Sequence, residues 1–130
     1  MLIATMSKMK VAIIDDDDSS CRALSRLVRG VGFEPTSFSS AETFLSDPKR
    51  SAFACLLLDI QLGGMSGLEL FRELLERHVR TPVLFITALD DPAARAEAVQ
   101  NGCAGFFRKT DPGEMIIAAL NRVAFANGAC

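Results

Sequence analysis

The chain has 130 residues, of which 49% are hydrophobic and 23% charged, and its formal net charge is −2. This length and apolar content predict one globular domain and argue against intrinsic disorder. The small negative charge gives no electrostatic reason to bind nucleic acid or an anionic membrane directly, and the apolar runs are too short to cross a bilayer. The first residues lack a signal-peptide pattern, so we expect a cytoplasmic protein.

The first half of the chain predicts strands that alternate with helices. Apolar, strand-sized runs occur at 10–14, 34–38 and 54–58. An amphipathic helix is expected over about 19–31. Ser39 and Glu42 form a capping-box pattern that opens a short second helix, which Asp47-Pro48 ends.

The second half of the chain continues this alternation, with strands expected at 83–86 and 104–107. Ser66 and Glu69 form a second capping box before a helix that runs through Arg77. Asp91-Pro92 starts a helix that stops near Gly102, and 111–114 caps a last helix. The residues expected to face the core from the third and last helices are Leu68, Phe71, Leu74, Leu75, Met115, Ile116, Leu120 and Val123.

Polar side chains follow four of the predicted strands directly. Four aspartates, Asp15 to Asp18, follow the first strand, Asp59 the third, Thr87 the fourth, and Lys109 lies just beyond the fifth. Strict alternation with short connections predicts an α/β fold, a parallel sheet with helices on both faces, whose ligands bind at the carboxyl ends of the strands. Acids, a hydroxyl and an ammonium at one edge indicate a Mg²⁺-assisted phosphoryl site.

The first strand ends at Ile14, and this end decides which aspartates face the site. The next two residues, Asp15 and Asp16, then stand at the edge of the sheet. We expect Asp17 and Asp18 only to cap the following helix, where negative charge is favoured. The four cysteines have no metal-site spacing and are read as reduced thiols, and His78 as a surface or capping residue.

The order and spacing of Asp15, Asp16, Asp59, Thr87 and Lys109 resemble the receiver domain of bacterial two-component response regulators. The run from Met65 to Leu70 also matches family usage, and the resemblance extends from about Lys10 to Phe125. It is greatest for the branch whose receivers usually precede a helix-turn-helix output domain. The resemblance implies a flavodoxin-like (βα)5 fold with a five-stranded parallel sheet in the order 2-1-3-4-5. The receiver domain is expected over 10–127, between an N-terminal extension (1–9) and a short tail (128–130).

The resemblance implies a role for each acid. Asp59 would be the phosphoacceptor and would form an aspartyl phosphate. Asp16 would bind Mg²⁺ directly and Asp15 mainly through water, while Asp59 and the backbone carbonyl of Gln61 would complete the protein ligands. Mn²⁺ would be a substitute for Mg²⁺.

The resemblance also implies roles for the other residues at this edge. Lys109 and Thr87 would each bind a phosphoryl oxygen, and the small Ala88 would allow a close approach. Thr87 would move toward the phosphoryl group, and Phe106 would turn into the space it leaves. Plain alternatives remain for three of these residues: a strand-end hydroxyl for Thr87, a solvated lysine for Lys109 and an ordinary core residue for Phe106.

The resemblance implies a regulatory domain, not an enzyme acting on outside substrates, although it would catalyse its own phosphorylation and dephosphorylation. Its partners would be a sensor histidine kinase and an output domain or downstream protein, with a homodimer formed on phosphorylation. Direct contact with nucleic acid or membrane is not expected. The output would be regulation of transcription.

Two departures from the family pattern occur near the site. Thr110 follows Lys109 where receivers usually carry proline, so we expect a trans bond there. Gly63 and Gly64 stand in the acceptor loop where proline is usual, and two glycines should loosen this loop and weaken metal binding.

Two other functions compete with the switch. A Mg²⁺-dependent phosphohydrolase of the haloacid-dehalogenase type also uses an aspartate nucleophile after a strand, but it needs an acid two residues later, where this chain has Gln61. The other is a receiver-like interaction module that works without phosphorylation. The complete set of acids, hydroxyl and lysine argues against that module.

Overall fold

Five strands alternate with helices along residues 9–88 and 90–128, the part of the chain that this computed structural model describes, with side chains through residue 124. The elements in chain order are β1 (Lys10–Ile14), α1 (Asp18–Gly30), β2 (Glu34–Phe38), α2 (Ala41–Ser46), the 3-10 turn η2 (Arg50–Ala52), β3 (Phe53–Leu58), α3 (Gly67–Glu76), β4 (Val83–Thr87), α4 (Pro92–Gln100), β5 (Gly105–Arg108) and α5 (Gly113–Gly128). The expected extension and tail lie almost wholly outside the described residues.

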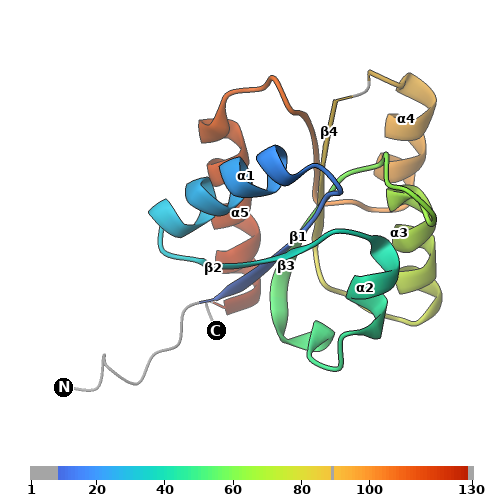
Figure 1. Cartoon of the computed structure of the whole chain (residues 1–130), viewed down its shortest axis with the longest axis horizontal. Helices are drawn as coiled ribbons and strands as arrows, with labels where there is room; N and C mark the ends of the chain where they lie inside the picture. The colour runs from blue at the N-terminus through green and yellow to red at the C-terminus, as the bar shows by residue number, and fades with distance from the viewer. Residues whose placement is uncertain (1–8, 89, 129–130) are drawn as a thin grey trace.

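The strands form one parallel sheet in the order β2-β1-β3-β4-β5. Helices α1 and α5 cover one face, and α2, α3 and α4 cover the other (Figure 1). The predicted fold class and strand order are therefore confirmed. None of the helices in the described part of the chain has the length and apolar character that a membrane span needs.

Strand β3 is the centre of the packing because its side chains enter two separate cores. Leu56 and Leu58 join the core under α2, α3 and α4, whereas Cys55 and Leu57 join the core under α1 and α5. An apolar residue at nearly every position is what a central parallel strand, buried on both faces, requires. The same packing fixes the strand end at Leu58, immediately before Asp59.

Helix starts follow the predicted signals with one correction. Asp17 is the N-cap of α1, Ser66 forms the full capping box of α3 with Glu69, and Asp91 caps α4. The N-cap of α2, however, is Ser40 and not Ser39, and its hydroxyl accepts from the Thr43 N–H. Glu42, three residues after Ser39, favoured the wrong serine, because its carboxylate accepts from the Met65 N–H and completes no capping box.

Two side chains expected in the core are largely exposed. Leu75 and Met115 face solvent, and Leu70, on the face of α3 that the prediction missed, is fully buried. Both errors place an apolar residue one position away from the true core stripe of its helix. His78 is an exposed surface residue, one of the two expected possibilities, and follows the C-cap Arg77 of α3; its φ of 59° lets the chain turn so that the Val79 N–H donates to the Leu74 carbonyl.

Replacing Ser66 by Ala should lower the free energy of unfolding by about 1 kcal/mol, because the variant loses the side-chain oxygen that accepts from the Glu69 N–H. Chemical denaturation of both proteins measures the difference. Ser51→Ala is the matched control, since Ser51 is exposed and caps no helix. Equal losses in the two variants would contradict a role for the cap.

Candidate functional site

Three carboxylates meet where β1 and β3 end. Ile14 pairs with Leu58 in the sheet, so the residues that follow them, Asp15 and Asp59, leave neighbouring strands side by side. Oxygens of Asp15, Asp16 and Asp59 all lie within 4.8 Å of one another. Asp15 and Asp59 are only 2% and 5% exposed, whereas Asp16 is open to solvent. The predicted choice of Asp15 and Asp16 from the four aspartates is the one that the structure brings together with Asp59.

The Lys109 ammonium lies between the two buried carboxylates. Its Nζ is 2.8 Å from Asp15 Oδ2 and 3.0 Å from Asp59 Oδ2. The backbone holds Lys109 in place, because its N–H donates to the Thr87 carbonyl at 2.8 Å. The Lys109–Thr110 bond is trans, as expected, and the side chain reaches both acids without a proline at 110.

Burial dominates the electrostatics of Asp15. Loss of solvent raises the pKa of Asp15, although contacts with Lys109 and with the Asp17 N–H act in the opposite direction. Burial by itself would lower the pKa of Lys109, but its hydrogen bonds to Asp15 and Asp59 outweigh burial and raise that pKa. The ammonium therefore remains charged and partly neutralises the acidic cluster.

The cluster fits a hard cation such as Mg²⁺. Asp15 Oδ2 is buried, and its partner among the described residues is the Lys109 ammonium at 2.8 Å. A buried oxygen of this kind, beside the solvent-facing carboxylate of Asp16, matches the preference of Mg²⁺ for a few carboxylates plus retained water. A hollow of about 490 Å³ adjoins this side and is lined by Asp16, Ile60, Gln61, Leu62 and Ser66.

The start of α3 packs directly against the backbone of Asp59. The Gly67 N–H donates to the Ile60 carbonyl, and a Cβ at Gly67 would lie 2.0 Å from the Asp59 carbonyl oxygen. No other residue fits there without moving the strand end. Within the loop, the Gln61 N–H donates to Asp59 Oδ1 at 3.2 Å, so both oxygens of the Asp59 carboxylate are held.

Glu42 is a residue of this region that sequence reasoning assigned to another role. Its carboxylate does not complete a capping box but accepts from the Met65 N–H at 2.8 Å, which ties α2 to the β3–α3 loop. Gly64 makes room for it: its φ is +76°, and a Cβ there would lie 2.7 Å from Glu42 Oε2. The two glycines therefore do not leave the loop unattached. No local pattern reveals this contact, because the two residues are far apart in the sequence.

The remaining predicted residues lie on β4 and β5. Thr87 is fully buried at the end of β4, and Ala88 follows it in an exposed bend. Phe106 is partly buried: its ring is 5.8 Å from that of Phe85, and the Arg95 guanidinium lies over it at 5.6 Å. Phe106 thus stands between the core and a surface cation of α4.

The sequence matches the response regulator receiver domain family over residues 11–121. The response regulator protein TodT of Pseudomonas putida is 39% identical over 110 residues, which cover 85% of this chain and 48% of TodT. The chain spans about half the length of the curated relatives it matches.

Solved structures share the same fold. The response regulator StyR is 33% identical with a TM-score of 0.84, and the match covers 95% of this chain and 62% of StyR. The BeF3-activated DrrB receiver domain is 27% identical with a TM-score of 0.80, and the match covers 90% of this chain and 97% of that receiver domain. Members of this family are phosphoacceptor switches of two-component signalling and generally bind Mg²⁺ at an acidic pocket. The chain belongs to the response regulator receiver domain family.

Proposed function

We propose that Asp59 accepts a phosphoryl group from a sensor histidine kinase. A carboxylate oxygen of Asp59 attacks phosphorus, the new P–O bond forms, and the P–N bond to the kinase imidazole breaks as the imidazole leaves. The observation that carries this proposal is the position of the Lys109 ammonium, 3.0 Å from Asp59 and 2.8 Å from Asp15 at one buried point. A cation held there is suited to pair with a phosphoryl oxygen.

The carboxylates of Asp16 and Asp59, the backbone carbonyl of Gln61 and, mainly through water, Asp15 would hold Mg²⁺, with Mn²⁺ as a substitute. The closeness of the three carboxylates and the buried oxygen of Asp15 support this ligand set. Repulsion between these acids and the incoming phosphoryl group would be offset by the bound ion.

Thr87 provides a second contact with the phosphoryl group, and Ala88 leaves room beside it. The Thr87 carbonyl accepts a hydrogen bond from the Lys109 N–H, and this bond holds the two residues together at the ends of β4 and β5. When Thr87 moves toward the phosphoryl group, Phe106 follows into the space and leaves the Arg95 guanidinium. This change alters the surface of α4 and β5, which an output domain or partner protein reads.

The domain over 10–127 acts inside the cytoplasm as a regulatory unit. It also takes a phosphoryl group from a small phosphodonor and hydrolyses its own aspartyl phosphate, without turning over outside substrates. Phosphorylation promotes a homodimer, and transcription is the regulated output. Relatives named transcriptional regulatory proteins, TdiR and FixJ, support transcription as the output.

Incubation with acetyl phosphate and Mg²⁺ should add the mass of one phosphoryl group to the intact protein. Asp59→Asn should abolish the adduct, because an amide is a poor nucleophile, and chelation of Mg²⁺ should greatly reduce it. Asp18→Asn is the matched control and should remain fully modified, since Asp18 lies on α1 outside the acidic cluster. If wild type gains no mass and beryllofluoride leaves its NMR spectrum unchanged, the chain is an inert interaction module.

Lys109→Met should make thermal stability depend more strongly on Mg²⁺. With the ammonium gone, only a metal ion can offset repulsion between Asp15 and Asp59, so Mg²⁺ should raise the melting temperature more in this variant than in wild type. Lys49→Met, which removes an exposed lysine at the other end of the domain, should respond to Mg²⁺ as wild type does. An equal Mg²⁺ response in all three proteins would show that Lys109 does not compete with the metal.

Glu42→Ala should weaken Mg²⁺ binding by on the order of tenfold, because the loop that carries Gln61 loses its bond from Met65 to α2. Glu42→Gln keeps an acceptor oxygen and should retain most of the affinity. Calorimetric titration with Mg²⁺ measures both effects, and the melting temperature without metal reports any general destabilisation. Glu76→Ala, at the far end of α3, is the control. Unchanged Mg²⁺ affinity in Glu42→Ala would mean that the loop keeps its shape unaided.

A further inference from the structure

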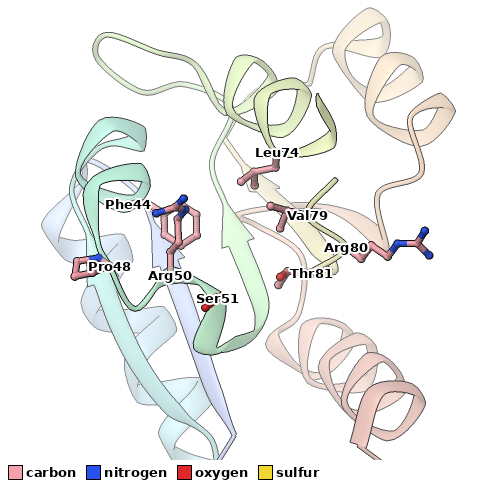
Figure 2. A pocket seen from close by; sticks show the side chains of 8 residues that line it. All are labelled: Phe44, Pro48, Arg50, Ser51, Leu74, Val79, Arg80 and Thr81. Atoms are coloured by element: carbon pink, nitrogen blue, oxygen red, sulfur yellow. The ribbon is translucent and has the colours of Figure 1, made fainter. Parts of the chain in front are cut away.

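A second cavity lies at the edge of the sheet opposite the acidic cluster. It has a volume of about 370 Å³ and is lined by Phe44, Pro48, Arg50, Ser51, Leu74, Val79, Arg80 and Thr81 (Figure 2). This volume is within the range of about 300–1,000 Å³ that is usual for small-molecule sites. Nothing in the phosphotransfer chemistry uses these residues, so the cavity needs its own explanation.

The cavity arises where the two central strands separate. Strand β3 begins at Phe53 but pairs with β4 only from Leu56, opposite Val83, so the chain before each strand diverges from its neighbour. Helix α2 and η2 form one wall, and the end of α3 with residues 79–81 forms the other (Figure 2). Four of the eight lining residues belong to α2, η2 and α3, and Pro48 and Val79 to Thr81 lie in the connections beside them.

The lining of the cavity is apolar inside and cationic at its mouth. Phe44 and Leu74 are 2% and 3% exposed and continue into the core, and Val79 packs against the same core. Arg50 is half-buried and lines the cavity from η2, whereas the Arg80 side chain extends away at the rim (Figure 2). Ser51 and Thr81 add hydroxyl groups.

The two arginines of this cavity form no ion pair with any described residue. In the described part of the chain, neither Arg50 nor Arg80 lies within 4.0 Å of a carboxylate, and no acidic residue lines the cavity. Arg50 Nη1 makes only a long contact of 3.4 Å with the Asp47 carbonyl. The nearby Asp47 carboxylate accepts from the Lys49 N–H at 2.8 Å and forms no ion pair with Arg50.

We propose that this cavity binds a small amphipathic carboxylic acid, with its carboxylate on Arg50 and its apolar body against Phe44, Leu74 and Val79. A guanidinium is suited to this role because its planar fork can donate two parallel hydrogen bonds to a carboxylate. Burial of an aromatic or aliphatic body removes apolar surface of Phe44 and Leu74 from water. Arg80 adds positive charge at the entrance.

The test uses 3-phenylpropionate as the probe and 3-phenylpropanamide as its uncharged control, both titrated into the full chain. Amide NMR shifts should saturate for the acid at Arg50, Ser51 and Val79 to Thr81, with no response at Asp15 or Asp59. Arg50→Met should weaken binding of the acid by roughly tenfold to a hundredfold. Arg77→Met removes a nearby arginine that pairs with Glu73 outside the cavity, and it should bind the acid as wild type does.

Three outcomes would overturn the proposal. Equal affinity for the acid and the amide would mean that the charge of Arg50 does not contribute to binding the carboxylate. Unchanged affinity in Arg50→Met, with a wild-type spectrum elsewhere, would show that the carboxylate does not bind there. The absence of saturable shifts up to the solubility limit of the probe would show that the cavity is too open to hold a ligand of this class.

Discussion

The ion pairs of Lys109 with Asp15 and Asp59 are the interaction on which the rest of this structure depends. Three carboxylates within 4.8 Å repel one another, and two of them are almost fully buried. Without a cation, burial at this point would be strongly unfavourable. The short β4–β5 anchor between the Thr87 carbonyl and the Lys109 N–H delivers that cation from two strands away. The strand order of the sheet therefore places the Lys109 ammonium next to the carboxylates of Asp15 and Asp59.

The acceptor loop shows how the backbone maintains this arrangement. Gly67 lets α3 start against the Asp59 carbonyl, and Gly64 leaves room for the Glu42 carboxylate. Each glycine serves a close approach, so the loop is held from both α3 and α2 even though it lacks proline. A position that looks permissive in the sequence is therefore constrained by its neighbours. The same walls, α2 and α3, continue to the opposite edge of the sheet and enclose the cavity at Phe44 and Leu74.

Local sequence patterns predicted helix caps and strands correctly where a pattern was compatible with only one register. The Ser66 capping box, the Asp91 cap and the apolar run of β3 were confirmed because each is decided by neighbours within a few residues. Errors arose where two registers were nearly equal. Ser39 and Ser40 offered alternative caps, and Leu75 and Met115 lie one residue beside the true core stripe. Helical periodicity alone cannot separate such neighbours, since packing against the sheet decides which is buried.

The sequence by itself determined the alternation of strands and helices, the choice of Asp15 and Asp16 over Asp17 and Asp18, and the set of acids, hydroxyl and lysine at one edge. These follow from apolar periodicity and from the rule that parallel strands end together. Only the tertiary structure decided that Lys109 contacts both buried acids, that Glu42 accepts from the Met65 N–H, and that Arg50 lines a cavity with Phe44 and Leu74. Each of these contacts joins segments whose distance is set by packing of the whole sheet, and no local pattern encodes that distance.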